Sequence, residues 1–231
     1  MRLINYNEQR HRSDIDEKYH QLNLGNIGRV MYWQNFFDMI KAVEGDIVEC
    51  GVGRGRSLLI LAAINSLLAA SDGGQRRIFG YDSFEGFPEP TVEDSSPRNP
   101  QKGEWSRSPS GNYTYSEDFT KQVIESAAVT TEMVTLTKGF FSESLAMHPD
   151  RPIALLHVDG DLYQSYTSTL QNLFARVAKG GIIVFDDFFE KDDVTTEPFP
   201  GARQAVKDFL RDSYSKLQVS MIGTYYFVKE T

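Results

Sequence analysis

The sequence predicts an α/β fold in which a mostly parallel β-sheet carries α-helices on both faces. Short apolar runs of strand length alternate with longer stretches in which apolar residues recur at helical spacing. Repeated strand and helix in this order is typical of a parallel sheet covered by its crossover helices. Apolar residues make up 40% of the 231 residues, and no repeat or low-complexity block interrupts them, which favours a single domain over residues 1–231.

Short β-rich runs are the expected strands of this sheet. They lie at 46–51, 77–82, 133–139, 153–160 and 181–187. β-Branched and aromatic side chains favour such positions because they fit a pleated, buried surface. After them, 218–230 alternates polar and apolar residues and predicts one or two terminal strands.

Stretches of helical period separate the strands, at 57–70, 116–129 and 165–181. Each opens on a serine, which can accept a hydrogen bond from an unpaired N–H group at a helix N-terminus. A further helix is expected over 201–217. Another, over 28–45, belongs to a helical lead-in at 1–45 that either packs on the sheet or acts as a lid.

The segment 85–112 departs from this pattern because it is dense in proline, serine, glycine and charged residues. Such a composition cannot bury a core of its own, so we expect a long surface loop. Loops of this length in compact domains are often lids or binding segments. The isolated aromatic residues Phe87 and Trp105 favour a lid over a plain disordered excursion.

The overall composition narrows the function. A net charge of −8 and a pI near 5.1 argue against a nucleic-acid partner, which needs a basic surface. The single cysteine, Cys50, excludes an intrachain disulfide, and no apolar run reaches the roughly 20 residues of a membrane span. The first 20 residues hold no apolar signal-peptide core, so we expect a cytoplasmic protein with a small-molecule substrate.

A glycine-rich turn follows the first expected strand, in "VECGVGRGRS" (48–57). Gly51, Gly53 and Gly55 permit a tight turn and close backbone approach. The helix beginning near Ser57 offers unpaired N–H groups to a carboxylate or phosphate. Such a turn indicates a nucleotide or nucleoside site more often than a structural turn when acids flank it.

Two acidic residues lie close to this glycine turn in the expected fold. Glu49 stands at the end of the strand before the turn, and Asp82 ends the next strand in "FGYDSFEGF". A carboxylate at the second position can accept hydrogen bonds from both ribose hydroxyls. The two acids therefore favour a nucleoside-containing cofactor.

Further acids are expected at the carboxyl edge of the sheet. Asp159 ends one strand, and Asp186 and Asp187 end the next, at the edge where open α/β sheets bind ligands. Adjacent carboxylates near an apolar core are unfavourable unless water, donors or a cation compensate them. Mg²⁺ or another hard divalent cation such as Ca²⁺ would do so. The alternative is a solvated pair in which Asp187 caps the following segment. Asp161 is a further candidate ligand, although its place before a helix favours a cap.

The acidic residue two positions before a G-x-G-x-G run resembles class I S-adenosylmethionine-dependent methyltransferases more than dehydrogenases. Methyltransferases that act on exocyclic nitrogen usually carry Asn/Asp-Pro-Pro-aromatic after the fourth strand. This chain has "VDGDLYQS" there, so we expect an oxygen acceptor.

The order of five motifs resembles the macrocin O-methyltransferase (TylF/MycF/NovP-like) family, from around Asn26 to the C-terminus. The motifs are "VECGVGRGRS", "GYDSFEGFP", "KGFFSESL", "LLHVDGDLYQSYTSTLQNLFARVAKGGIIVFDDF" and "GARQAVKDF". The resemblance implies a Rossmann-like class I methyltransferase fold with a mostly parallel seven-stranded sheet. It also implies methyl transfer from S-adenosylmethionine to a sugar hydroxyl of a glycosylated natural product, Mg²⁺ as a second cofactor, and a tendency to form homo-oligomers.

Carried over by motif, the metal ligands are Asp159, Asp186 and Asp187. The residues assigned to the cofactor are Glu49, Gly51, Gly53, Gly55, Ser57, Asp82, Ser83, Gly139, Phe140 and Asp159. The chain departs from the family at one place. After "CGV" the family commonly has an aromatic residue and then Arg-Gly-Gly, whereas this chain has Gly53, Arg54, Gly55 and Arg56.

In the expected reaction the acceptor hydroxyl attacks the sulfonium methyl group in line. Asp159 is the candidate base, and His157, on the same face of the strand, is its rival, because a carboxylate that coordinates a cation is a weakened base. A histidine inside a strand is, however, more often a satisfied core residue than a base. Three alternatives stay open: a phenolic or catechol acceptor, a nicotinamide-dependent oxidoreductase that uses the same glycine turn, and a catalytically silent module that only binds S-adenosylmethionine.

Overall fold

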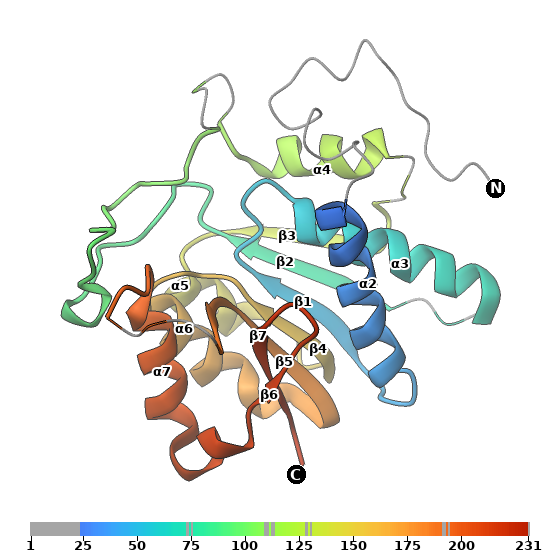
Figure 1. Ribbon diagram of the computed structural model, residues 1–231. Helices are drawn as coiled ribbons and strands as arrows, with labels where there is room; N and C mark the ends of the chain where they lie inside the picture. The colour runs from blue at the N-terminus through green and yellow to red at the C-terminus, as the bar shows by residue number, and fades with distance from the viewer. Residues whose placement is uncertain are drawn as a thin grey trace.

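A computed structural model describes residues 24–230 apart from 73, 75, 109–110, 112–113, 128, 130, 191–192 and 194, so residues 1–23 of the expected lead-in lie outside it. Its centre is a seven-stranded sheet in the order β3-β2-β1-β4-β5-β7-β6 (Figure 1). The strands are β1 (Asp46–Cys50), β2 (Ile78–Asp82), β3 (Val134–Lys138), β4 (Ile153–Val158), β5 (Val177–Phe189), β6 (Gln218–Val219) and β7 (Thr224–Val228). β1 to β5 pair in parallel and β7 is antiparallel to both its neighbours, which confirms the mostly parallel seven-stranded sheet.

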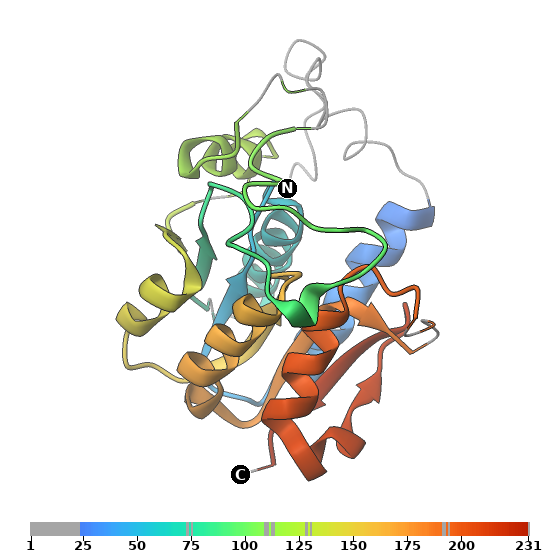
Figure 2. The same ribbon diagram turned by 90° about the vertical axis from the view of Figure 1, so that its left-hand side faces the viewer.

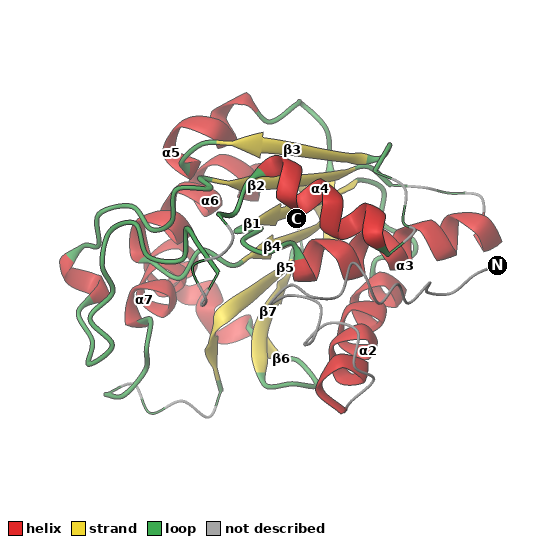
Figure 3. Ribbon diagram, turned by 90° about the horizontal axis from the view of Figure 1, so that it is seen from above, coloured by secondary structure: helices red, strands yellow, loops and turns green. Residues whose placement is uncertain are grey.

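Helices cover both faces of the sheet, as the sequence predicts (Figures 2 and 3). One face carries α2 (Leu24–Met39), α3 (Arg56–Asp72) and α4 (Glu117–Ser126). The other carries α5 (Phe141–Ser144), α6 (Tyr163–Leu173) and α7 (Pro200–Leu210). No helix in the described ranges is both long and apolar enough to cross a bilayer.

The alternation of side chains along the strands divides the buried core into two layers. In β5, Ile183 and Phe185 belong to the layer under α6 and α7, whereas Ile182 and Val184 belong to the layer under α2 and α3. All four side chains are fully buried. A strand that is apolar on both faces must lie inside the sheet, which explains its unbroken hydrophobic run.

Several element boundaries differ from expectation, and the helix expected over 28–45 spans Leu24–Met39. The helical stretch 165–181 is wrong beyond Leu173, because a 3₁₀ turn follows and β5 already begins at Val177, which pairs with Ile153 of β4. Val177 favours a strand, and Gly180, with φ of +78°, lies in the left-handed region that a helix does not use. The helix expected to 217 ends at Leu210 and continues only as a 3₁₀ turn.

The serine caps are confirmed at one of three helices. The Ser116 hydroxyl accepts a hydrogen bond from the backbone N–H of Phe119 at the start of α4. Ser57 and Ser165 lie inside α3 and α6, because these helices begin earlier than the apolar pattern indicates. Apolar periodicity marks the buried face of a helix, which need not start at its first turn.

Candidate functional site

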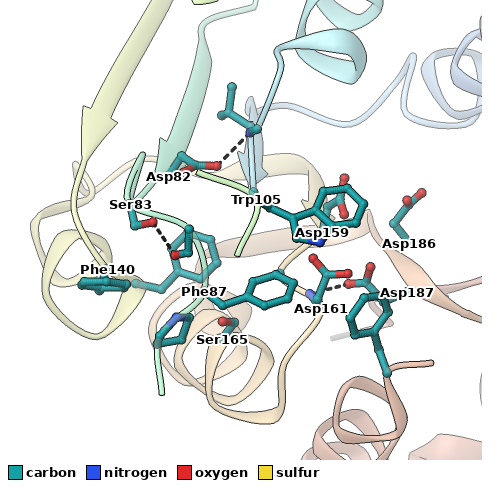
Figure 4. A pocket seen from close by; sticks show the side chains of 18 of the residues that line it. Asp82, Ser83, Phe87, Trp105, Phe140, Asp159, Asp161, Ser165, Asp186 and Asp187 are labelled. Carbon is teal, nitrogen blue, oxygen red and sulfur yellow. Dashed lines mark hydrogen bonds between the residues drawn. The ribbon is translucent and has the colours of Figure 1, made fainter. Parts of the chain in front are cut away.

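A cavity of about 760 Å³ opens at the carboxyl ends of the parallel strands. Its wall includes the turn after β1, the ends of β2, β4 and β5, and part of the loop 85–112 (Figure 4). This is the edge at which open α/β sheets bind ligands. The volume lies within the range of about 300–1,000 Å³ that is typical of small-molecule sites.

The glycine turn after β1 is built for close backbone contact. At Gly51, φ is +103° and a Cβ atom would lie 1.6 Å from the carbonyl oxygen of Asp159, so no side chain fits. Gly53 also has a positive φ and its N–H group donates to Asp82 Oδ2 at 2.8 Å. Gly55 is buried against Thr120 of α4 and does not line the cavity. The expected turn is therefore present, with Gly51 and Gly53 on the cavity and Gly55 behind it.

Asp82 lies at the end of β2 and faces the cavity. Its second oxygen, Oδ1, accepts from the Phe84 N–H at 2.6 Å. Burial raises the pKa of Asp82, and the backbone donors Gly53, Phe84 and Val52 oppose that rise. Each carboxylate oxygen has a second lone pair, so the fixed side chain can still accept from a ligand hydroxyl.

The other residues expected at the cofactor site divide into two groups. Ser57, Ser83 and Phe140 line the cavity, whereas Gly139 lies behind its wall. The Ser83 hydroxyl donates to the Gly86 carbonyl at 2.8 Å, so the hydroxyl proton is already used in a hydrogen bond to the adjoining loop. Phe140 follows β3 and contributes an apolar surface.

Glu49 and His157 lie beneath the cavity and do not line it. Both are fully buried, and Glu49 Oε1 is 3.0 Å from His157 Nδ1. On the other side, His157 Nε2 is 3.7 Å from Asp186 Oδ1, a charge contact longer than an ordinary hydrogen bond. Burial lowers the pKa of His157, but Asp186 and Glu49 outweigh it and raise the pKa well above its usual value. His157 therefore lies as a cation between two carboxylates, out of reach of a ligand in the cavity.

Four aspartates meet at the other end of the cavity: Asp159, Asp161, Asp186 and Asp187 (Figure 4). Ligand atoms lie within 4.8 Å of one another in two clusters, one of His157, Asp159 and Asp186 and one of Asp159, Asp161 and Asp187. The expected trio is thus divided between two clusters that share Asp159. Burial, Asp186 and Asp187 raise the pKa of Asp159 well above its usual range.

The pKa of Asp186 is shifted the opposite way from those of its neighbours. Burial would raise it, but His157 lowers it below its usual value, with help from Arg29 and Arg56. Burial and Asp186 raise the pKa of Asp187 to about 6. Asp186 thus stays ionised in the absence of any added cation.

Asp161 does not cap α6, contrary to the preference drawn from its place in the sequence. Its φ is +58°, and its N–H group donates to Asp187 Oδ2 at 2.8 Å. The N-terminus of α6 is instead satisfied by Asp94 of the loop 85–112, whose Oδ1 accepts from the Tyr163 N–H at 2.7 Å. Sequence analysis missed Asp94, because nothing local relates it to a helix 69 residues later.

The residues present fit both groups that the motifs imply. At the Gly51 end, the closely packed turn and the Asp82 carboxylate suit a nucleoside-containing molecule. At the other end, crowded hard-oxygen donors with raised pKa values suit a hard divalent cation.

Curated relatives share part of the sequence. A demethyldecarbamoylnovobiocin O-methyltransferase of Streptomyces niveus is 33% identical over 146 residues, which are 63% of this chain and 53% of the relative. An 8-demethyl-8-(2,3-dimethoxy-alpha-L-rhamnosyl)-tetracenomycin-C 4'-O-methyltransferase of Streptomyces olivaceus is 31% identical over 146 residues, which are 63% of this chain and 54% of the relative. The chain thus spans about half the length of these curated relatives.

Solved structures share the fold over most of the chain. The calicheamicin methyltransferase CalS11 has a TM-score of 0.73 at 23% identity, over 90% of this chain and 80% of that one. The O-methyltransferase NovP has a TM-score of 0.68 at 26% identity, over 89% and 81%. The family described as Macrocin-O-methyltransferase (TylF) matches residues 10–225. The chain is therefore a member of the TylF macrocin O-methyltransferase family and has a class I methyltransferase fold.

Proposed function

We propose that the protein is an S-adenosylmethionine- and Mg²⁺-dependent O-methyltransferase whose acceptor is a hydroxyl on a sugar of a glycosylated natural product. The observation that carries this proposal is a single cavity with a nucleoside-type glycine turn at one end and clustered carboxylates at the other. The curated relatives support the acceptor class, since both names describe O-methylation of natural products and one of them names a rhamnosyl group.

Asp159 connects the two ends of this cavity. Its backbone carbonyl lies against Gly51, and its N–H group donates to the Cys50 carbonyl at 2.8 Å, which fixes β4 against the glycine turn. Its carboxylate belongs to both acidic clusters. A methyl donor on the turn and a hydroxyl near the aspartates would meet beside this residue, and such positioning supplies a large part of the catalysis of a two-substrate reaction.

Asp159, Asp186 and Asp187 would hold the divalent cation. When bound, the cation would favour the ionised form of the acceptor hydroxyl and fix its place. Asp186 is ionised without it because His157 lies alongside. Asp161, whose pKa is raised well above its usual range by burial and Asp187, adjoins the trio as a protonated neighbour.

Asp159 is also the proposed base. Its carboxylate belongs to both acidic clusters and its backbone adjoins the glycine turn, so it lies where the proton of the acceptor hydroxyl would be released. The acceptor oxygen bonds to the methyl carbon, the carbon–sulfur bond breaks, and the hydroxyl proton passes to Asp159. We do not assign that role to His157, because it is buried beneath the cavity and Asp186 and Glu49 raise its pKa well above its usual value.

The test is a methyl-transfer assay with S-adenosylmethionine, read as formation of S-adenosylhomocysteine, with Mg²⁺ or with EDTA. Acceptors would be desmethyl glycosides of the novobiocin, tetracenomycin and macrolide types, with catechol as the phenolic comparison. We expect transfer to a glycoside that EDTA and Asp159→Asn each abolish. Asp150→Asn, a change to a fully exposed aspartate paired with Arg176, should leave the rate unchanged.

Direct binding separates this proposal from its alternatives. Titration calorimetry should show binding of S-adenosylmethionine and none of NADH. Binding of NADH alone would indicate an oxidoreductase and overturn the assignment of the cofactor. Cofactor binding without transfer to any acceptor, with or without Mg²⁺, would indicate a silent binding module.

A further inference from the structure

The loop 85–112 and Phe199 together present an aromatic surface to the cavity, which we call the aromatic wall and define as Phe87, Trp105 and Phe199. All three residues line the cavity. The rings of Phe87 and Trp105 stack with centroids 6.4 Å apart and planes 22° apart, and Phe199, before α7, meets Phe87 edge to face at 6.1 Å. Phe87 is buried, whereas 55% of the Trp105 surface is exposed. The wall therefore offers one large uncovered ring face, that of Trp105.

A cation supports these rings. The Arg98 guanidinium lies 5.5 Å from the Phe87 centroid, 6.0 Å from that of Trp105 and 4.8 Å from that of Phe199. Its Nη2 atom pairs with Glu104 at 2.8 Å. Arg98 itself does not line the cavity. A guanidinium over several ring faces fixes their positions, so the wall is preformed.

The backbone beneath Trp105 is also held in an unfavourable conformation. Its φ is +67°, in the left-handed region that a bulky residue seldom adopts. Two hydrogen bonds next to Trp105 join the two arms of the loop. The Phe87 N–H donates to the Glu104 carbonyl and the Gly103 N–H donates to the Phe87 carbonyl, each at 3.0 Å. Strain of this kind persists when surrounding contacts hold it, and it clusters at ligand sites.

The loop is anchored to the helices that flank the cavity. Asp94 accepts from the N–H groups of Thr91 and Tyr163, and the Ser96 hydroxyl donates to the Pro198 carbonyl at 2.9 Å. Gly201 of α7 lies so close that a Cβ atom there would be 1.9 Å from Asp94 Oδ1. These contacts therefore hold the aromatic wall in a fixed position against α6 and α7.

Polar groups border the space in front of the wall. In Figure 4 the rings of Phe87 and Trp105 project toward the space bordered by Asp159, Asp161 and Asp187. The α6 side chains Gln164, Ser165 and Ser168 add amide and hydroxyl groups to the same cavity. The space thus has one apolar face and several hydrogen-bonding groups, which is the pattern of a site that orients a ligand by a few polar contacts.

We infer that Trp105 is the stacking platform for a pyranose ring, an inference that rests on the proposed function and names the part of the acceptor held at this site. A pyranose has an apolar C–H face and hydroxyls at its edge, so it can cover the indole while its hydroxyls reach the aspartates and α6. A phenol or catechol can also stack, but its one or two hydroxyls would leave more of these polar groups unpaired than the several hydroxyls of a pyranose, at a cost in binding.

The experiment is saturation-transfer NMR on the protein saturated with S-adenosylhomocysteine and Mg²⁺, with methyl α-L-rhamnopyranoside as the probe and catechol as the competitor. Wild type should transfer saturation to the ring C–H protons of the sugar. Trp105→Phe should keep most of this signal, and Trp105→Ala should weaken sugar binding about tenfold. Catechol should compete poorly.

Val92→Ala is the matched control, because Val92 is an apolar residue of the same loop that is 82% exposed and does not line the cavity. It should bind the sugar as wild type does. Calorimetry with S-adenosylhomocysteine should give unchanged affinity for all three variants, which shows that each is folded.

The outcomes separate the platform from the proposed function. Equal sugar binding by wild type and Trp105→Ala, no sugar binding by wild type, or displacement of the sugar by equimolar catechol would each overturn the platform while leaving cofactor binding intact. Failure of wild type to bind S-adenosylhomocysteine would instead remove the proposed function.

Discussion

The carboxyl edge of the sheet contains two regions that deal with negative charge in different ways. In the first, Glu49 and Asp186 lie on either side of the buried cation His157. In the second, Asp159, Asp161 and Asp187 are crowded against one another, with His157 near Asp159 on one side. In the first region the pKa of Asp186 falls below its usual value, although burial raises that of Glu49. In the second, burial and mutual repulsion raise the pKa values of all three aspartates.

This difference in charge compensation indicates which of the two regions a bound divalent cation would change. In the first region His157 compensates the carboxylates on either side of it whether or not a ligand is present, although burial still raises the pKa of Glu49. In the second region, donors such as the Asp161 N–H group on Asp187 do not suffice, and the pKa values of all three carboxyl groups stay raised. A divalent cation would take the place of the protons that these groups hold. One region is therefore part of the fold, and the other is the part of the site that responds to ligands.

Removing His157 should have the largest effect on stability. His157→Gln leaves the buried Glu49 without its partner, and breaking such a pair typically costs about 3–5 kcal/mol. The double variant Glu49→Gln/His157→Gln should lose less free energy of unfolding than the sum of the two single variants, as measured by urea unfolding.

His148→Gln is the control. His148 is also buried, but burial lowers its pKa to about 4, so it is neutral. Its replacement should lower the free energy of unfolding by only about 1 kcal/mol, for the hydrogen bond to Tyr81. Equal losses for both histidines would contradict the comparison.

Changing the second region should act on metal binding. Asp187→Asn should weaken Mg²⁺ binding about 100-fold, because a ligand charge is lost. Asp161→Asn should weaken it less than about tenfold, because Asp161 is the protonated neighbour. Calorimetric titration of Mg²⁺ into both variants would check this, and an equal loss would make Asp161 a ligand.

The pH dependence of the metal-free protein should show the same crowding. The folded pKa of Asp187, about 6, lies above the value near 4 of an unfolded aspartate, so protonation favours the folded state. The free energy of unfolding of wild type, minus that of the Asp187→Asn variant, should therefore rise by about 1–3 kcal/mol as the pH falls from 7.5 towards 4.5 in EDTA. Subtracting the variant removes the contribution of the other titrating groups. Unfolding curves of the two proteins at each pH give the difference. If that difference does not vary with pH, Asp187 is not crowded in solution.

Arg29 should have the smallest effect. Its charge acts on Asp186 across the cavity wall, and it also repels a cation nearby. Arg29→Gln should tighten Mg²⁺ binding by less than about fivefold, in keeping with partly exposed charges. Arg211→Gln, at an exposed site outside the cavity, should change nothing. Weaker binding in Arg29→Gln would show that Arg29 positions Asp186 instead of merely repelling the metal.

Some features of the site could be read from the sequence because their causes are local. The turn at Gly51 and Gly53 and the acid at Asp82 each follow a recognisable strand. Since strands of a parallel sheet end at the same edge, Asp159 and Asp186 were expected to meet there, and both line the cavity. The seven-stranded sheet itself came from the family resemblance as much as from periodicity.

Other features could not be read in this way. Glu49 was expected at the cofactor and His157 either as a rival base or as a core residue, but their pairing beneath the cavity, 108 residues apart in sequence, was not foreseen. The sequence shows on which face of a strand a residue lies, but not how completely the helices that pack on that face bury its side chain. Trp33 of α2 packs edge to face on His157 at 4.7 Å and closes it off from solvent.

The sequence by itself determined the layered α/β architecture, the turn that follows β1 and the edge at which the acids gather, because strand period, glycine content and strand direction are properties of short segments. The tertiary structure alone decided that Asp94 completes the N-terminus of α6 and that Arg98 holds the rings of the aromatic wall. It also decided which carboxylates have a cation inside the chain. These contacts join segments far apart in the sequence, and only packing determines which side chains face one another.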